Sequence, residues 1–363
     1  MPTNNFTDSN TLTGWLKQLG IAALYALLIY VGELYFDSDI VVGYFEPASG
    51  LALAALLLGG KRYALGLLLG ATLVRTISED SLWEAAIISL VDTLQALCGA
   101  WLLTRDGKFD SRLQSLRDYL RLILLGGYAS IAIGTLAVNT TLLISGALHT
   151  GDYFHSLIQW WMSDTLGVIL ITPLILVWWS ERDNRREAGK IAETVLLFGL
   201  TILAGQAVFL DWWHDAIGPV AQGYWMFLIT TWAAVRLGIR ETVIVLLMTA
   251  VYALLGAIWG VGFFADDIIQ SQLVNYWFYM LTLSVVGMAL ATYFAERKQA
   301  EVELRIASAA FESQESMLIT DADGVILRVN QAFTEATGYT SEEGRGSDTT
   351  PAQVRPPGRG LLS

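Results

Sequence analysis

Ten apolar runs are separated by short polar islands along the first 295 residues of the chain. Most approach the ~20 residues that a helix needs to cross a hydrocarbon core of ~30 Å. They also lack the polar face that a surface helix of a soluble protein turns toward water. The pattern predicts an all-α polytopic membrane bundle with about ten transmembrane helices, at residues 17–36, 47–60, 62–78, 82–104, 117–146, 156–179, 191–211, 222–237, 240–260 and 274–295.

Composition supports this class. Hydrophobic residues make up 54% of the 363 residues and charged residues 15%, whereas a soluble domain carries about 25% charged residues. The net charge of −12 comes without a basic stripe, so we expect a lipid bilayer and no nucleic acid as a partner. The single cysteine, Cys98, lies in an apolar run and excludes a disulfide framework within the chain.

Lys and Arg residues occur in every second connection between the runs. The connections 37–46, 79–81, 147–155, 212–221 and 261–273 contain neither residue type. Because basic residues are retained on the cytoplasmic side, this alternation predicts that both termini are cytoplasmic. The basic connections contain Lys61, Arg62, Arg105, Lys108, Arg112, Arg117, Arg182, Arg185, Arg186, Lys190, Arg236, Arg240, Arg297 and Lys298.

The second run is short. From Pro47 to Gly60 a helix would cover roughly 21 Å, which is less than the membrane core. One hypothesis is a helix that begins inside the membrane and directs its positive N-terminal end at a cavity. The alternative is a steep helix that continues the apolar stretch from Ile40 to Phe45.

Ionisable and polar residues in the outer half of the predicted bundle are candidates for a binding site, because such groups are costly inside a membrane. Arg75 is expected to pair with Asp92 or Asp164, and such a pair has two interpretations. The pair has an architectural role, or it belongs to a ligand pocket that is open to the outside and able to receive an anionic group. The predicted ligand-binding residues are Arg75, Asp92, Gln95, Asp164, Trp160 and Glu46. His149, His155 and His214 lack the spacing of metal ligands, so no metal is expected. The sequence does not identify a cofactor.

The composition changes after residue 295. Residues 296–314 predict a charged cytoplasmic helix whose apolar positions, among them Val302, Ile306 and Phe311, form one stripe, as in a dimeric coiled coil. We therefore expect a homodimer. Two short strands, Met317–Thr320 and Val325–Asn330, flank the turn Asp321-Ala322-Asp323-Gly324. A helix from Ala332 to Thr337 follows, ending at Gly338.

These residues resemble known families. The segment from Met317 to Glu343, with its I-T-D-A-D-G turn and its N-x-A-F step, resembles the first third of a PAS domain. Residues 15–300 resemble the membrane-associated sensor family of type one (MASE-one). This resemblance rests on F-E-P-A-S-G at 45–50, the small-residue helix at 66–71, D-T-L-Q-A-L at 92–97, W-W-M-S-D-T-L-G at 160–167, Pro173, W-A-A-V-R-L-G at 232–238 and the closing A-E-R-K. Arg75 departs from the neutral polar residue expected at its position.

The resemblance implies a bacterial signalling receptor in the inner membrane. In that family a membrane domain controls a cytoplasmic output, most often a diguanylate cyclase or a cyclic-di-GMP phosphodiesterase and sometimes a histidine kinase. This chain contains no G-G-D-E-F, no E-A-L and no phosphoacceptor motif, so the chain itself is not expected to be an enzyme. Its function is then a sensory input module for an unidentified small-molecule or membrane-protein cue. The alternative is a small-molecule transporter or permease.

The expected organisation has five parts: a cytoplasmic N-terminus at 1–16, the transmembrane sensor domain at 17–295, a signalling helix at 296–314, a truncated PAS start at 315–343 and a disordered tail at 344–363. The tail lacks a hydrophobic period. One hypothesis is that its codons, read in another frame, encode the continuation of the PAS domain; the nucleotide sequence tests this.

Overall fold

The computed structural model describes residues 8–36, 44–78, 82–180, 188–213, 222–312, 315–323 and 325–338. The chain divides into two compact units, Met1–Ala295 and Glu296–Ser363. The predicted tail at 344–363 lies outside the described residues. The first unit is helical, and its elements in chain order are α1 (Asp8–Phe36), α2 (Pro47–Gly59), η1 (Lys61–Tyr63), α3 (Ala64–Ser78), α4 (Leu82–Thr104), α5 (Leu116–Arg121), η2 (Leu122–Ala129), α6 (Ser130–Ser145), α7 (Tyr153–Ser180), α8 (Ala188–Phe209), α10 (Trp225–Trp232), η3 (Ala233–Leu237), α11 (Ile239–Trp259), η4 (Gly262–Phe264), α12 (Asp267–Ser271) and α13 (Val274–Phe311).

The helices agree with the class predicted from the apolar runs, since each run overlaps a helix. Among the described residues, seven helices are long and apolar enough to cross a membrane. The other three runs correspond to α2, α3 and the combined α10–η3 segment, which are shorter. The long apolar helices therefore identify the chain as a multi-pass membrane protein. The predicted count of ten crossings stays a prediction.

Helix α2 lies at the centre of the first half of the bundle. Pro47 occupies its first turn, where a missing N–H costs nothing, and the Glu46 side chain caps it by accepting a hydrogen bond from the Ala48 N–H at 3.3 Å. Residues 47, 48 and 50–56 are buried. Tyr44 and Phe45 are not helical, so the alternative of one helix that continues through this stretch from Ile40 is wrong at these two residues.

Two glycines let α2 and α7 meet backbone to backbone. A Cβ atom on Gly50 would lie 2.2 Å from the carbonyl oxygen of Gly167, and a Cβ atom on Gly167 would lie 1.9 Å from that of Glu46. Thr172 adds a hydrogen bond to the carbonyl oxygen of Gly50 at 2.9 Å. The next residue, Pro173, lies inside α7. This close approach fixes the position of α2 against α7.

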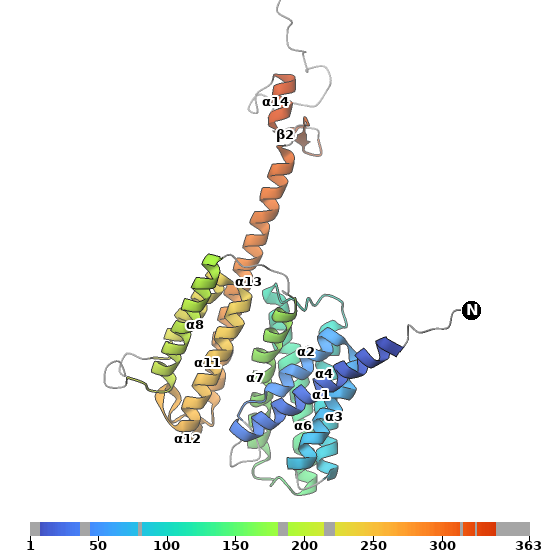
Figure 1. The fold of residues 1–363 in the computed structure, drawn as a ribbon, viewed down its shortest axis with the longest axis vertical. Coiled ribbons are helices and arrows are strands. Elements are labelled where there is room, and N and C mark those ends of the chain that lie inside the picture. Colours follow the sequence, from blue (N-terminus) through green and yellow to red (C-terminus); the bar gives the residue numbers. More distant parts are fainter. Residues whose placement is uncertain are drawn as a thin grey trace, which may run out of the picture. The chain divides into compact units, whose positions relative to one another are not determined.

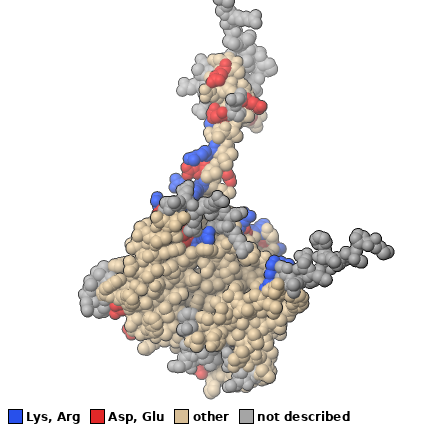
Figure 2. All heavy atoms as spheres, viewed as in Figure 1, with Lys and Arg blue, Asp and Glu red and all other residues tan. Residues whose placement is uncertain are grey.

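Helix α7 lies in the middle of the bundle in Figure 1, with α8 and α11 on one side and α1, α3, α4 and α6 on the other. Many of the large apolar side chains that point away from the core are exposed, among them Leu69, Leu73 and Ile133. In a bilayer this surface faces lipid. Figure 2 shows Lys and Arg gathered at one end of the first unit and an apolar flank beside them.

The second unit contains the end of α13 and a small hairpin. Strands β1 (Leu318–Thr320) and β2 (Ile326–Val329) pair antiparallel, and α14 (Gln331–Thr337) follows and ends at Gly338 with φ 78°. The predicted hairpin and the helix after it are confirmed. The identity of this segment as the start of a PAS domain stays a prediction.

Asn330 joins the parts of the hairpin unit. Its side-chain oxygen accepts hydrogen bonds from the N–H groups of Met317 and Phe333, both at 2.9 Å. Its side-chain NH₂ donates to the carbonyl oxygens of Phe311 at 2.8 Å and Glu315 at 2.6 Å. One buried amide therefore connects α13, the segment before β1 and the first turn of α14.

Candidate functional site

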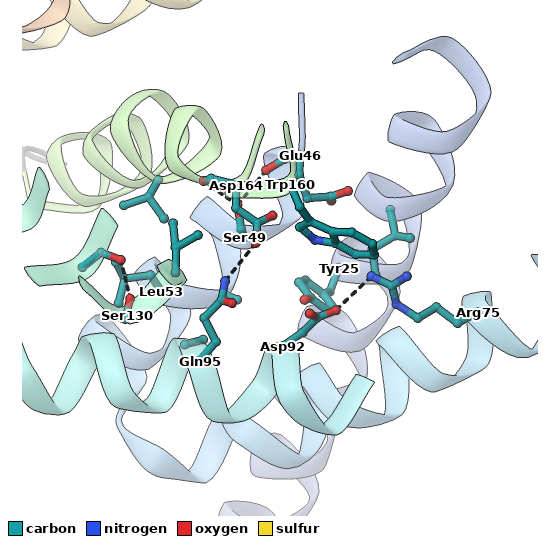
Figure 3. A pocket seen from close by; sticks show the side chains of 16 residues that line it. Tyr25, Glu46, Ser49, Leu53, Arg75, Asp92, Gln95, Ser130, Trp160 and Asp164 are labelled. Atoms are coloured by element: carbon teal, nitrogen blue, oxygen red, sulfur yellow. Dashed lines mark hydrogen bonds and ion pairs between the residues drawn. The ribbon is translucent and has the colours of Figure 1, made fainter. Parts of the chain in front are cut away.

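A small polar cavity lies among α1, α2, α3, α4, α6 and α7, and Figure 3 shows the side chains that line it. Its free space is about 20 Å³, enough for about one water molecule. All six predicted ligand-binding residues line this cavity: Glu46, Arg75, Asp92, Gln95, Trp160 and Asp164. The structure therefore brings together side chains that are as many as 118 positions apart in the sequence.

Arg75 and Asp92 form an ion pair with 2.9 Å between the guanidinium Nη2 and the carboxylate Oδ2. The pair arises because α3 and α4 are neighbours in the sequence and pack side by side. The two side chains are only 11% and 13% exposed, so each depends on the other for neutralisation. Of the two partners considered for Arg75, the structure selects Asp92.

Gln95 lies one helical turn after Asp92 and faces a different partner. Its side-chain NH₂ donates to Asp164 Oδ2 at 3.0 Å, joining α4 to α7. Gly134 on α6 makes room for this amide, since a Cβ atom there would lie 1.7 Å from the Gln95 side-chain oxygen. Asp164 is 4% exposed, so its carboxyl oxygens must find their hydrogen-bond partners inside the protein.

Glu46 and Ser49 occupy the start of α2 at the edge of the cavity. The Ser49 hydroxyl lies 2.8 Å from the Glu46 carbonyl oxygen and 3.0 Å from the Asp164 carbonyl oxygen. Its proton is shared between two backbone acceptors on different elements. Because the Glu46 side chain caps α2 and also lines the cavity, a change at this carboxyl group acts directly on the end of the central helix.

Three carboxyl groups and one guanidinium line the cavity. With Asp92 paired to Arg75, Glu46 and Asp164 are the two carboxyl groups that no guanidinium of the lining neutralises within 4.0 Å. Buried carboxylates without a compensating charge are costly in a low dielectric. The arrangement can therefore hold added positive charge.

Sequence reasoning missed three polar residues of the lining. Tyr25 comes from α1, Ser49 from α2 and Ser130 from α6. Ser49 could have been found, since it lies three residues after Glu46 in the same short motif. Tyr25 carries no such signal, because single tyrosines are common in apolar membrane helices.

The family scan matches residues 17–298 to the model described as MASE1. The chain belongs to the MASE1 family. The match covers every residue that lines the polar cavity, so the cavity is a feature of the MASE1 region of this protein. The predicted membership is confirmed. The match ends at residue 298, before the segment that resembles a PAS domain.

A curated relative is the Escherichia coli (strain K12) protein named "Probable diguanylate cyclase DgcE", which is 23% identical over 345 residues. The alignment covers 91% of this chain and 30% of the relative, so the MASE1 chain spans less than a third of that protein's length. No solved structure matches the chain. Membership in MASE1, the apolar helices and this relative support a membrane sensory module of a signalling protein.

Proposed function

We propose that this chain is the sensory input module of a bacterial signal-transduction protein, and that the polar cavity receives the cue. The proposal rests on one observation above all: side chains from six separate helices converge on a buried polar cavity in a region that matches MASE1. Ionisable groups inside a membrane are costly and mark functional sites. In the intact protein the module controls cyclic-di-GMP synthesis or breakdown, a role consistent with the named relative.

The module lies in the bacterial inner membrane with both termini in the cytoplasm. Support comes from the basic connections, of which the described residues include Lys61, Arg105 and Arg240. Connections at the other end carry no Lys or Arg in the sequence. Since the positive-inside rule counts such short loops, the cavity faces the outer half of the membrane.

The cue adds positive charge to the cavity. A proton or a small cation fits the excess of carboxyl groups, with Glu46 and Asp164 as its partners and Gln95, Arg75, Asp92 and Trp160 as the surrounding wall. Free space of about 20 Å³ suits a particle of this size. An anion would meet Arg75 only after displacing Asp92 from its ion pair.

Transmission runs toward α13, which continues to Phe311. Its apolar positions Val302 and Ile306 are 49% and 64% exposed, and with Ala309 they follow the alternating spacing of four and three that pairs helices in a coiled coil. The cytoplasmic part of α13 therefore forms a parallel homodimer. The cue biases the output by its difference in affinity for two arrangements of that dimer.

Hydrogen–deuterium exchange of the full chain in lipid nanodiscs tests the proposal. Asp164→Asn removes a negative charge permanently and imitates the occupied cavity, so exchange in residues 296–311 should differ several-fold from that of the unaltered protein. The matched control is Asp110→Asn, at an exposed loop position, which should leave exchange unchanged. An effect of Asp164→Asn that stays confined to the cavity helices would contradict a sensory role.

A transport assay distinguishes the proposed sensor from the main alternative, a small-molecule transporter. Proteoliposomes that contain the chain are loaded with buffer and given radioactive sodium or an imposed proton gradient. A sensor binds without net flux, whereas a transporter accumulates the ion, and accumulation that Asp164→Asn abolishes would favour the transporter.

A further inference from the structure

A second cavity lies on the other side of α7, between this helix and the start of α13. Its polar lining consists of Tyr44, Gln159, Ser163, Gln272, Tyr276 and Trp277. Its free space is about 20 Å³, again enough for about one water molecule. No charged residue occurs among the described residues that line it, so an ion would lack a counter-charge there.

Two atoms of this lining need a hydrogen-bond partner. The side-chain oxygen of Gln159 and the indole N–H of Trp277 are both buried, and neither has a partner among the described residues. Leaving such a buried group unpaired is destabilising, because it has lost its hydrogen bonds to water without replacing them. One of the two atoms is an acceptor and the other a donor, and they are not bonded to each other.

The surroundings keep the indole in place. The Trp277 ring packs against Trp161, with 5.4 Å between ring centroids, and against Tyr128 at 6.1 Å. Trp277 is 4% exposed, so turning the indole would disrupt this packing. Trp161 differs in one respect, because its own N–H donates to the Tyr128 carbonyl oxygen at 3.3 Å.

The wall beside α13 has a specific backbone conformation. Gln272 and Leu273 have positive φ angles of 54° and 66°, a left-handed conformation that is strained for residues with a side chain. Asp267 holds this turn by accepting hydrogen bonds from the N–H of Tyr276 at 2.9 Å and from the Asn275 amide at 2.8 Å. The wall of the cavity is thus shaped by a turn that other contacts maintain.

We propose that this second cavity binds one uncharged molecule that presents a hydroxyl group, either water or a small alcohol. Its hydroxyl hydrogen is donated to the Gln159 oxygen, and its oxygen accepts the Trp277 N–H. A hydroxyl supplies both a donor and an acceptor, as this pair requires. The bound molecule joins α7, the helix of Asp164, to α13. The inference does not depend on what the first cavity binds.

NMR of the full chain in nanodiscs, with nitrogen-15 in the tryptophan indoles, tests the proposal. Trp277→Phe assigns the Trp277 indole peak. If water is bound, this peak should show a direct cross-relaxation contact with water. If methanol binds on addition, the peak should contact the methanol methyl group and shift until binding is saturated. The first result identifies water as the occupant and the second a small alcohol.

Gln159→Met keeps the size of the side chain and removes the acceptor. It should shift the Trp277 peak and remove its contact with water or methanol, while the Trp161 peak keeps its position and shows neither contact. Gln159→Met is expected to move one indole peak, and that peak identifies Trp277. The assignment therefore holds even if Trp277→Phe does not fold. An indole peak that contacts neither water nor methanol, or that Gln159→Met leaves unchanged, overturns the proposal.

Discussion

Gly50 on α2 and Gly167 on α7 are in such close contact that a Cβ atom on Gly50 would lie 2.2 Å from the Gly167 carbonyl oxygen. The contact lies one turn from Glu46, which caps α2, and one turn from Asp164 of α7. The geometry of the polar cavity therefore depends on the absence of two side chains as much as on the charged groups that line it.

Gly167→Ala should force α2 away from α7, because the added carbon would lie 1.9 Å from the Glu46 carbonyl oxygen. Overpacking of this kind destabilises by about 1–3 kcal/mol. Thermal unfolding in detergent, followed by the loss of the monodisperse chromatographic peak, measures the effect. Gly199→Ala is the matched control, since nothing lies within 4 Å of its added carbon; equal midpoints for the two variants would contradict the prediction.

The ion pair between Arg75 and Asp92 should behave as a unit. Arg75→Gln alone leaves a buried carboxylate without its partner and should cost about 3–5 kcal/mol of stability. The double change Arg75→Gln with Asp92→Asn removes both charges and should restore most of the stability, which the same unfolding assay measures.

The double variant also separates the two roles considered for this pair. If it is stable but its α13 no longer responds to added sodium or to a change of pH, the pair takes part in binding the cue. A stable double variant with a normal response identifies the pair as purely architectural.

Asn330→Ala should loosen the hairpin unit, because four hydrogen bonds of its side chain are lost. The loss of an N-cap alone costs about 1 kcal/mol, and the remaining bonds raise the expected total to about 2–4 kcal/mol. Hydrogen exchange at residues 318–329 measures it. Gln331→Ala, an exposed amide at the next position, should change exchange little; equal exchange in both variants would show that Asn330 does not organise the hairpin.

Ile306→Glu should separate the dimer that we propose for α13, because it places a charge in the apolar stripe. Mass photometry in nanodiscs should then show a shift from dimer to monomer. Leu304→Glu is the control: Leu304 is apolar and 72% exposed but lies off the stripe, so the dimer should persist. Dissociation by both variants, or by neither, argues against this register.

The positions of the helices could be predicted because a membrane helix is specified by a long apolar stretch, and the predicted run at 82–104 coincides with α4. The composition of a run does not report local changes in helix geometry. The predicted run at 117–146 includes the π-helical segment Leu122–Ala129, and the run at 222–237 ends in a second one, Ala233–Leu237. No periodicity argument distinguishes these segments from α-helix over so few residues.

The candidate site was predictable in its members and less so in its contacts. Charged residues in apolar runs stand out because they are costly there, which identified Arg75, Asp92 and Asp164. The choice of Asp92 as the partner of Arg75 depends on the packing of α3 against α4, and the contact between Gln95 and Asp164 depends on Gly134 leaving space. Neither relation can be read from spacing along the chain.

Pro173 has a mechanical consequence for α7. A proline has no N–H, so α7 lacks the hydrogen bond that residue 173 would otherwise give to the carbonyl of Ile169. Asp164 lies on one side of this level, and the turns that lead to Ser180 lie on the other. The helix is therefore least stiff between these two parts. A displacement near Asp164 can tilt the part of α7 that carries Asp164, while the part that leads to Ser180 stays packed against its neighbours.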